Sequence, residues 1–221
     1  MILLNSFEFN SIIPDLTFSS MNDSLAKILT IVFQPLLMPL YGLVMLIAVP
    51  EFYGYNMLIK LIVIGIAILL MVVLPVLWYF MLVKLGVITT PQASDRRERV
   101  WAYLFTILCY AGTAAFFYAV ESYTIAHVIT MAVALLATVL VINFFWKISA
   151  HATGVSGLLG ASISIGLAYG AYNPALYVAL IMICGFVCSA RLQLEAHTPA
   201  QLVAGTALGF TYMLPLPLLI W

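Results

Sequence analysis

The chain has 221 residues, of which 65% are hydrophobic and 7% are charged, and its formal net charge is zero. A soluble globular domain carries about 25% charged residues, so this composition indicates a polytopic membrane protein rather than a soluble domain. Eight Lys/Arg residues balanced by eight Asp/Glu residues give no basic surface for nucleic acid, and no such partner is expected.

Residues 1–24 mix apolar and polar stretches and are predicted to form an interfacial or loosely ordered segment. A positive region does not precede an apolar one here, so a cleaved signal peptide is not expected. Asn22, Asp23 and Ser24 are N-cap residue types, which places the start of the first long helix at this point.

Residues 25–221 are predicted to form a single membrane domain, an all-α bundle of six to seven transmembrane helices, with seven preferred. A helix needs about 20 apolar residues to cross about 30 Å of hydrocarbon. Segments of suitable length run roughly over 27–49, 57–83, 100–119, 124–146, 152–171, 175–190 and 199–220. Pro35 and Pro39 should kink the first segment and Pro75 should bend the second, which a packed bundle tolerates.

Seven spans place three polar stretches on one membrane face, together with the N-terminus. These are the 84–99 loop, the 147–151 junction and the 191–198 junction. Seven of the eight Lys/Arg residues fall on this face and only Lys60 on the other. The positive-inside rule therefore predicts that this face is cytoplasmic.

The first polar stretch runs from Gln92 to Arg99 and contains Arg96 and Arg97. One interpretation is a positive loop that fixes topology. The other is a set of guanidinium groups that bind a phosphate in bidentate fashion.

The second stretch begins at Lys147 and contains Ser149 and His151, followed by glycines. Free backbone N–H groups at a helix start favour an anion, so this is a candidate phosphate site. Alternatively, Ser149 is a helix cap and the glycines allow close helix packing. A capping role does not explain His151.

The third stretch, from Arg191 to Gln201, brings a cation, the Glu195 carboxylate and His197 together between two apolar segments. Charged residues at a helix end in a membrane protein are a functional-site hypothesis by default. The alternative is a short polar loop in which Arg191 extends towards lipid headgroups.

Cysteines and glycines inside the apolar segments are interpreted structurally. Cys109, Cys184 and Cys188 are predicted to be buried, inert thiols, because too few other ligands surround them for a metal. Gly166 and Gly170 are predicted to serve helix packing. Gly205 and Gly209 form a small-xxx-small pair that suits either a dimer or internal packing.

The order and spacing of the three stretches resemble the phosphatidic acid phosphatase type 2 superfamily, the membrane branch of the acid phosphatase/vanadium haloperoxidase fold. That family has the motifs Lys-x6-Arg-Pro, Pro-Ser-Gly-His and Ser-Arg-x5-His-x3-Asp, the last two separated by a helical hairpin. Arg191 and His197 have the spacing of the third motif, Ser149 and His151 fit the second, and Arg99 fits the first-motif arginine.

The resemblance covers roughly residues 84–210 and implies a phosphatase-like helical core. The departures from the motifs are Gln92 for lysine, Val100 and Ile148 for prolines, Ala150 for glycine, Ala190 for serine and Gln201 for aspartate. Gln201 matters most, because a carboxylate both orients its histidine and stabilises the imidazolium, whereas an amide can only accept a hydrogen bond. Glu195, Asp95 and Glu98 are further candidate carboxylates. Arg96, Arg97 or Lys147 could supply the missing first-motif cation.

By this resemblance, His197 is the nucleophile that forms a phosphohistidine, and His151 is the general acid and then the base for water. Arg99 and Arg191 would hold the phosphoryl oxygens. The candidate substrate-binding residues also include Ser149, Arg96, Arg97 and Gln92. Neither a metal nor another cofactor is required.

Three functions are compatible with these residues. The first is an integral-membrane phosphatase for a lipid phosphate or diphosphate, with the lipid bilayer as surroundings and source of substrate. The second is a weak or inactive relative that binds or translocates such a lipid, and the third is an accessory membrane protein. The short loops favour a prokaryotic inner or plasma membrane, although many family members work on its outer face. Oligomeric state is left open.

Overall fold

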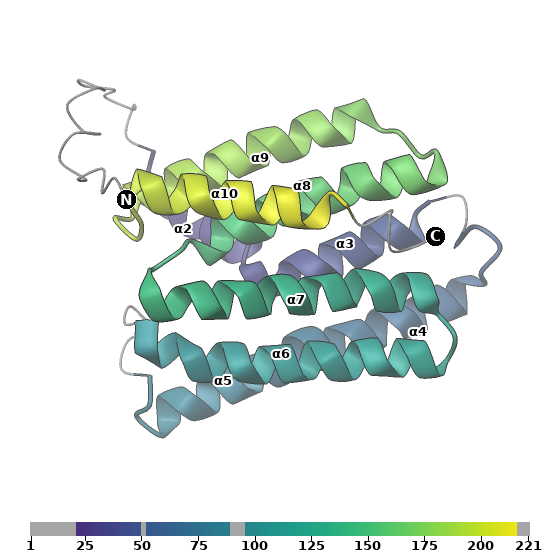
Figure 1. Cartoon of the computed structure of the whole chain (residues 1–221), viewed down its shortest axis with the longest axis horizontal. Coiled ribbons are helices and arrows are strands. Elements are labelled where there is room, and N and C mark those ends of the chain that lie inside the picture. Colours follow the sequence, from purple (N-terminus) through teal and green to yellow (C-terminus); the bar gives the residue numbers. More distant parts are fainter. Residues whose placement is uncertain (1–20, 50–51, 89–95, 216–221) are drawn as a thin grey trace.

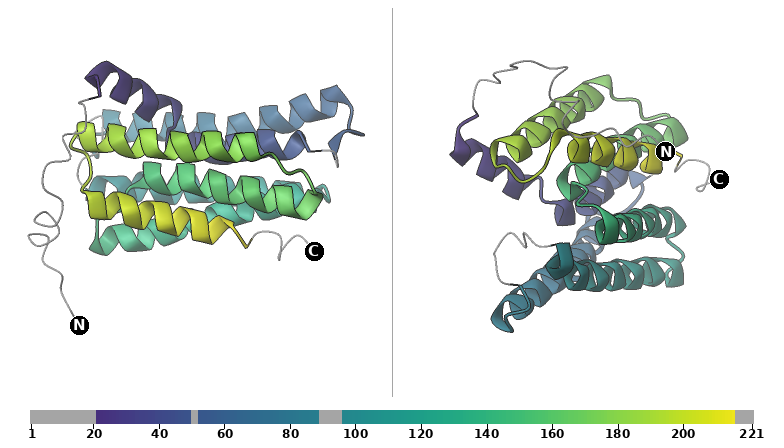
Figure 2. Two further views of the ribbon diagram at one scale, coloured as in Figure 1. Left: turned by 90° about the horizontal axis from the view of Figure 1, so that it is seen from above. Right: turned by 60° about the vertical axis from the view of Figure 1, so that its left-hand side comes forward.

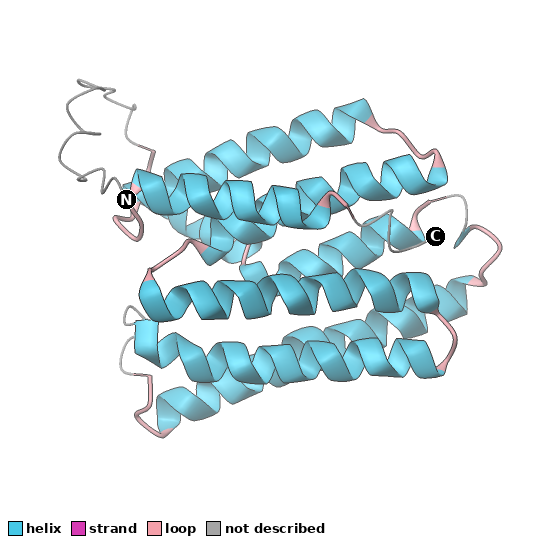
Figure 3. Cartoon of the chain, viewed as in Figure 1, coloured by secondary structure: helices cyan, strands magenta, loops and turns pink. Residues whose placement is uncertain are grey.

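The structure is a computed structural model that describes residues 21–49, 52–88 and 96–215, without the side chains of Arg96 and Arg97. All regular secondary structure in these residues is helical (Figure 3). The elements are α2 (Asp23–Val32), η1 (Pro35–Leu37), α3 (Met38–Ile47), α4 (Met57–Ile68), η3 (Leu69–Val73), α5 (Leu74–Lys84), α6 (Arg96–Ala119), α7 (Tyr123–Phe145), α8 (Ala150–Tyr169), α9 (Pro174–Gln193) and α10 (Pro199–Met213).

Within the described residues, six helical stretches are long and apolar enough to cross a membrane. They are 23–47, 57–84, 98–119, 123–145, 150–169 and 174–193. This confirms a multi-pass, all-helical membrane protein. The predicted seventh span, 199–220, corresponds to α10, which has 15 residues and ends at Met213. The structure describes the chain as far as residue 215.

The first span is broken where the prolines predicted a kink. Phe33 and Gln34 separate α2 from the short 3-10 turn that starts at Pro35. Proline removes a backbone donor and leaves carbonyls of the preceding turn without helical partners. Tyrosine hydroxyls satisfy two carbonyls at this break, with Tyr41 donating to Val32 at 2.9 Å and Tyr110 donating to Leu36 at 3.0 Å.

The second span has a local irregularity just before Pro75. The helix is continuous from Met57 to Lys84 but passes through one π-helical turn, Leu69–Val73, just before this proline. A π turn is a local widening that lets the helix continue past such an interruption.

The helices form two groups with α3 between them (Figures 1 and 2). One group contains α8, α9, α10 and α2, and the other contains α4 to α7, whereas α3 contacts α8, α7 and α4. The central helix is α8: 72% of the residues in its most apolar window are buried, against 11% for the span made by α4 and α5. The core of the first group therefore surrounds α8.

Glycines set the close approach of α10 to α8. A Cβ on Gly209 would overlap the carbonyl of Thr153, and one on Gly205 would lie 2.8 Å from the carbonyl of Ser149. On the other side of the contact, a Cβ on Gly160 would lie 2.6 Å from the carbonyl of Phe210. The Gly205/Gly209 pair thus serves packing inside the chain, one of the two roles that its spacing allowed.

The two glycines near the end of α8 have different roles. Gly166 packs against the Tyr177 hydroxyl of α9, which confirms the predicted packing role. The same prediction was wrong for Gly170, where an added Cβ would meet nothing within 4 Å. Gly170 instead ends α8 in the left-handed conformation, with φ of 65°, which glycine adopts without steric cost.

Polar caps mark the helix starts. The Asn22 side chain accepts from the amide of Ser24 at 2.8 Å, so α2 begins at Asp23, two residues before the expected boundary of the membrane domain. Ser149 caps α8 by accepting from Ala152 at 3.4 Å. Thr198 and Gln201 form a capping box at the start of α10.

Helix directions bring the described parts of all three polar stretches to one end of the bundle (Figure 1). We call it the site end: α6, α8 and α10 begin there, and α7 and α9 end there. Lys60 lies near the start of α4 at the other end, 5.8 Å from the ring centre of Tyr53. The predicted topology of these polar stretches is therefore confirmed.

Candidate functional site

Cations and histidines from four segments meet at the site end. Arg99 comes from the first turn of α6, Lys147 from the junction before α8, and Arg191 from the last turn of α9. All three act electrostatically on His197, which lies in the turn between α9 and α10. Residues nearly 100 positions apart in sequence therefore form one cluster.

His197 is held by Gln201, four residues further along the chain. Its side chain is only 8% exposed, and its Nδ1 lies 3.0 Å from Oε1 of Gln201. The backbone amide of Thr198 donates to the same oxygen at 3.2 Å. Because an amide N–H can only donate, the atom it faces must be the amide oxygen, so Nδ1 of His197 carries the proton. Nε2 of the neutral ring then has a free lone pair.

The surroundings of His197 keep its ring neutral. Burial lowers the pKa of His197 to about 4, and the positive charges of Arg191, Arg99 and Lys147 act in the same direction. The hydrogen bond to Gln201 opposes this shift by favouring the charged ring, but it is the smaller influence. At neutral pH the imidazole is therefore uncharged, which is the form a nucleophilic histidine requires.

His151 has a different polar neighbour, Thr30 of α2. The backbone carbonyl of Thr30 acts on the His151 ring as a hydrogen-bond acceptor. The Nε2 atom of His151 is buried and has no hydrogen-bond partner among the described residues. His151 and His197 interact electrostatically.

Thr30 also holds Arg191. The Nη1 of Arg191 donates to the Thr30 hydroxyl at 3.4 Å, whereas its Nε is buried without a partner in the described part of the chain. A second contact ties α2 to the end of α9, where Gln193 donates to Asp23 at 2.9 Å. Thr30 was not predicted from the sequence, since a threonine within an apolar run carries no signal of its own.

Lys147 lies close to Arg99 and Arg191 at the site end. Burial lowers its pKa, and the charges of Arg99 and Arg191 lower it further, so the three cations are close neighbours. Gln92 and Asp95 lie outside the described residues, as do the side chains of Arg96 and Arg97. Their predicted roles are therefore not placed by the structure.

Two predicted phosphate ligands have structural partners. Ser149 is completely buried and caps α8, and its amide donates to the Gln201 carbonyl at 3.4 Å, which joins the starts of α8 and α10. Arg99 hydrogen-bonds to the hydroxyl of Tyr103 one turn further along α6. The capping interpretation of Ser149 is confirmed, and substrate binding by Ser149 and Arg99 stays a prediction.

Two further polar residues are not part of the contacts around the histidines. Glu195 is exposed and has a φ of 47° in the turn after α9, and it is not among the charged groups that act on His197. His127 lies near the start of α7 at the opposite end of the bundle, with Nδ1 2.7 Å from the Tyr123 carbonyl oxygen.

Among the described residues, no group of three His, Cys, Asp or Glu side chains is arranged to hold a metal ion. No protein-family model, no curated protein and no solved structure matches this chain. The function must therefore be argued from the chemistry of the site itself.

Proposed function

We propose that this protein is an integral-membrane phosphatase that hydrolyses a lipid phosphate or diphosphate through a phosphohistidine at His197. One observation carries the proposal: two histidines lie beside three cations at one end of an apolar bundle. His197 has its proton on Nδ1 and a free lone pair on Nε2, and the Nε2 of His151 is buried without a hydrogen-bond partner among the described residues. Phosphoryl transfer needs mainly positioning and charge stabilisation, and this cluster supplies both.

In the first step, Nε2 of His197 attacks phosphorus and the bond from phosphorus to the leaving oxygen breaks. A phosphate monoester has a second pKa of about 6, so it can arrive with one proton. That proton passes to Nε2 of His151 and then to the leaving oxygen, which departs as an alcohol. For a diphosphate, the leaving oxygen belongs to the lipid monophosphate. Arg191, Arg99 and Lys147 stabilise the charge on the transferred group.

In the second step, water attacks the phosphohistidine. Nε2 of His151, now neutral again, accepts a proton from that water. The bond between phosphorus and His197 breaks, which releases inorganic phosphate and restores the free imidazole. His151 passes the proton that it took from water to the departing phosphate, so both rings are neutral again. Gln201 still accepts from Nδ1 of His197, which therefore returns to its starting tautomer.

The substrate is proposed to be a lipid because the cluster lies at the ends of helices that are apolar along their length. A phosphate at this depth would have its chain beside the hydrocarbon-facing helices. We place the protein in a prokaryotic inner or plasma membrane on the basis of its short loops.

A second function is favoured by Gln201. An amide orients His197 but does not balance the positive charge that develops on the ring, and replacing the equivalent carboxylate in serine proteases costs about 10⁴ in rate. The cluster would still bind a phosphate headgroup. Binding or translocation of a lipid phosphate without hydrolysis is therefore the alternative proposal.

Phosphate release from purified protein in detergent separates the two functions. The substrates are phosphatidic acid, phosphatidylglycerophosphate and undecaprenyl diphosphate, and the variants are His197→Ala and His127→Ala. We expect release that His197→Ala abolishes and that His127→Ala leaves unchanged, since His127 lies at the other end of the bundle. Trapping of acid-labile phosphate on His197 would establish the intermediate.

Release that survives His197→Ala would contradict the assignment of the nucleophile. Absence of release from all three lipids, with folded protein that binds them in an Arg191-dependent way, would favour the binding or translocation function.

A further inference from the structure

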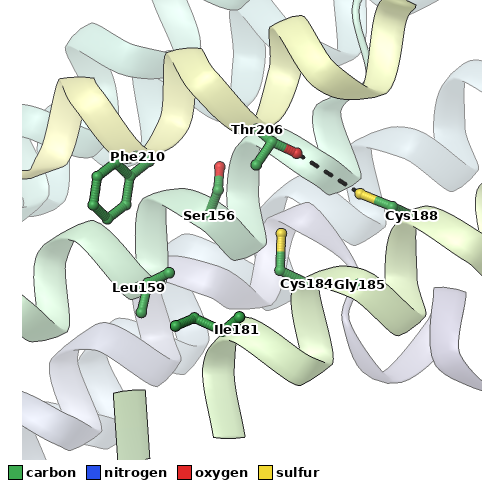
Figure 4. A pocket seen from close by; sticks show the side chains of 8 residues that line it. All are labelled: Ser156, Leu159, Ile181, Cys184, Gly185, Cys188, Thr206 and Phe210. Atoms are coloured by element: carbon green, nitrogen blue, oxygen red, sulfur yellow. Dashed lines mark hydrogen bonds between the residues drawn. The ribbon is translucent and has the colours of Figure 1, made fainter. Parts of the chain in front are cut away.

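A groove of about 310 Å³ lies between α8, α9 and α10 (Figure 4). It is lined by Ser156, Leu159, Ile181, Cys184, Gly185, Cys188, Thr206 and Phe210. Its volume is at the lower end of the range of about 300–1,000 Å³ that ligand sites occupy. The same three helices carry His151, Arg191 and Gln201 at the site end.

The groove starts directly below the cluster. Cys188 lies three residues before Arg191 on α9, Thr206 lies five residues after Gln201 on α10, and both lie deeper in the bundle. A helix rises about 1.5 Å per residue, so the groove begins about 5–8 Å from these site residues. Ile181 is ten residues before Arg191, which extends the groove to a depth of about 15 Å.

One side of the groove is open to the surroundings of the bundle. Ile181 is 56% exposed, and a Cβ on Gly185 would meet nothing within 4 Å. The floor is closed, since Cys184 and Leu159 are buried. In a membrane, this opening faces hydrocarbon, so a chain could enter sideways from the bilayer.

The polar atoms of the groove are already engaged with the protein. The Ser156 hydroxyl donates to the Thr153 carbonyl at 3.2 Å, and Thr206 and Cys188 interact at 3.7 Å (Figure 4). Such a groove offers an apolar wall rather than a set of directed donors, and it suits an alkyl or prenyl chain.

We propose that this groove holds the hydrocarbon chain of the lipid whose phosphate occupies the cluster at the site end. The chain reaches the groove through the opening at Gly185, between α9 and α10. This inference rests on the proposed function for its headgroup, but it assigns a separate site and can fail separately.

Gly185→Leu tests the groove with little effect on packing, because the new side chain would project into open space. Gly112→Leu on α6 is the matched control, since a Cβ there also meets nothing within 4 Å. The substrates are dioleoyl phosphatidic acid, whose chains reach the groove, and dibutyryl phosphatidic acid, whose chains are too short to fill it. The two substrates carry the same phosphate group and differ only in the length of their acyl chains.

We expect Gly185→Leu to lower kcat/KM for the dioleoyl substrate about tenfold or more, as steric changes in an apolar pocket do, and to spare the dibutyryl substrate. Gly112→Leu should change neither. An equal loss for both substrates, or no loss for either, would overturn the groove as the chain site.

Alkylation of the native cysteines gives a readout that does not need catalysis. Protein in dioleoyl phosphatidylcholine nanodiscs is treated with N-ethylmaleimide, with and without added dioleoyl phosphatidic acid, and each cysteine is followed by mass spectrometry. Cys184 and Cys188 line the groove, whereas Cys109 lies on α6 and serves as the internal control.

Selective protection of Cys188 and Cys184 by phosphatidic acid supports the groove, even if no lipid is hydrolysed. In that case the chain site stands and the phosphatase function fails. Hydrolysis without protection and without a chain-length effect of Gly185→Leu leaves the phosphatase function in place and removes the groove proposal.

Discussion

The group of helices around α8 and the group made by α4 to α7 are packed in different ways. Between α8 and α10, glycines bring backbone against backbone, with Gly205 close to the carbonyl of Ser149. Between α5 and α6, large side chains fill the space, and the rings of Trp78 and Phe105 stack at 4.5 Å. Small residues at a helix interface let the two backbones approach closely in lipid, whereas large side chains keep the backbones of α5 and α6 further apart.

This difference explains where the histidines lie. The Ser149 amide donates to the Gln201 carbonyl, so the starts of α8 and α10 are joined directly. Each start carries one histidine, and the glycine contacts below hold the two helices at that separation. The position of His197 relative to His151 therefore depends on backbone packing within the bundle as well as on the polar residues around it.

Gly209→Ala should have the largest effect, because its Cβ would overlap the Thr153 carbonyl. Overpacking of this kind costs about 1–3 kcal/mol, and the backbone of α8 cannot move away as a flexible side chain could. Unfolding in mixed micelles should show this loss. Gly112→Ala, in open space on α6, should be neutral or slightly stabilising, because alanine favours a helix more than glycine does.

Equal stability of Gly209→Ala and Gly112→Ala would show that the two groups of helices do not differ in the proposed way. A loss of phosphate release in Gly209→Ala at a temperature where it remains folded would link α8–α10 packing to the histidine geometry.

Gln201→Leu should lower kcat by a factor on the order of 10² or more, because it removes the acceptor that fixes the His197 tautomer. Loss of the equivalent tautomer control in a serine protease lowers kcat by a factor of about 10⁴. Gln201→Glu is the informative partner. Glutamate suits the third position of a capping box, so α10 should keep its start while His197 gains a negative neighbour. Phosphate release that is indifferent to both substitutions would rule out Gln201 as the residue that orients His197.

The pH at which His197 becomes charged can be measured by carbethoxylation, which requires a neutral imidazole. An ordinary histidine has a pKa of about 6.5 and loses reactivity below it. The pKa of His197 is lowered to about 4, so its ring should stay neutral and reactive as pH falls from about 6.5 towards 4. Gln201→Glu should move that loss of reactivity to higher pH, because a carboxylate stabilises the charged ring. If His197 of the wild type lost its reactivity towards the reagent already near pH 6, the lowered pKa would be contradicted.

Much of the fold was predictable because the signals are local. Pro35 follows a break in the first span, Asn22 caps α2, and the spacing of apolar segments places the three polar stretches at one end. Each of these predictions follows from a residue acting on its own helix, or from counting spans. Gly170 shows the limit, since a glycine at a helix end serves a turn and a glycine within a helix serves packing, and the sequence pattern alone assigned both to packing.

The cluster was predictable in part. The number of spans between Arg99, His151 and His197 predicts that they lie at the same end of the bundle, and the structure places them there. The capping box of Thr198 and Gln201 was also readable as T-x-x-Q, and it gives Gln201 a structural role at the start of α10 in addition to its contact with His197. Thr30 was not readable, because its two contacts are to residues 121 and 161 positions away and depend on how α2 packs.

Thr30→Val should have the smallest effect, and it separates the two contacts of this residue. Valine keeps the backbone carbonyl that holds His151 but removes the hydroxyl that accepts from Arg191. A hydrogen bond to a charged group contributes about 1.5–3 kcal/mol. The bond between Arg191 and Thr30 is long, at 3.4 Å, so it should contribute no more than the lower part of that range. KM for phosphatidic acid should therefore rise about tenfold or less. Because His151 keeps its contact with that carbonyl, kcat should change little, and Thr30→Ser should restore KM. A fall in kcat with KM unchanged would place the Thr30 hydroxyl in the chemical step rather than in the positioning of Arg191.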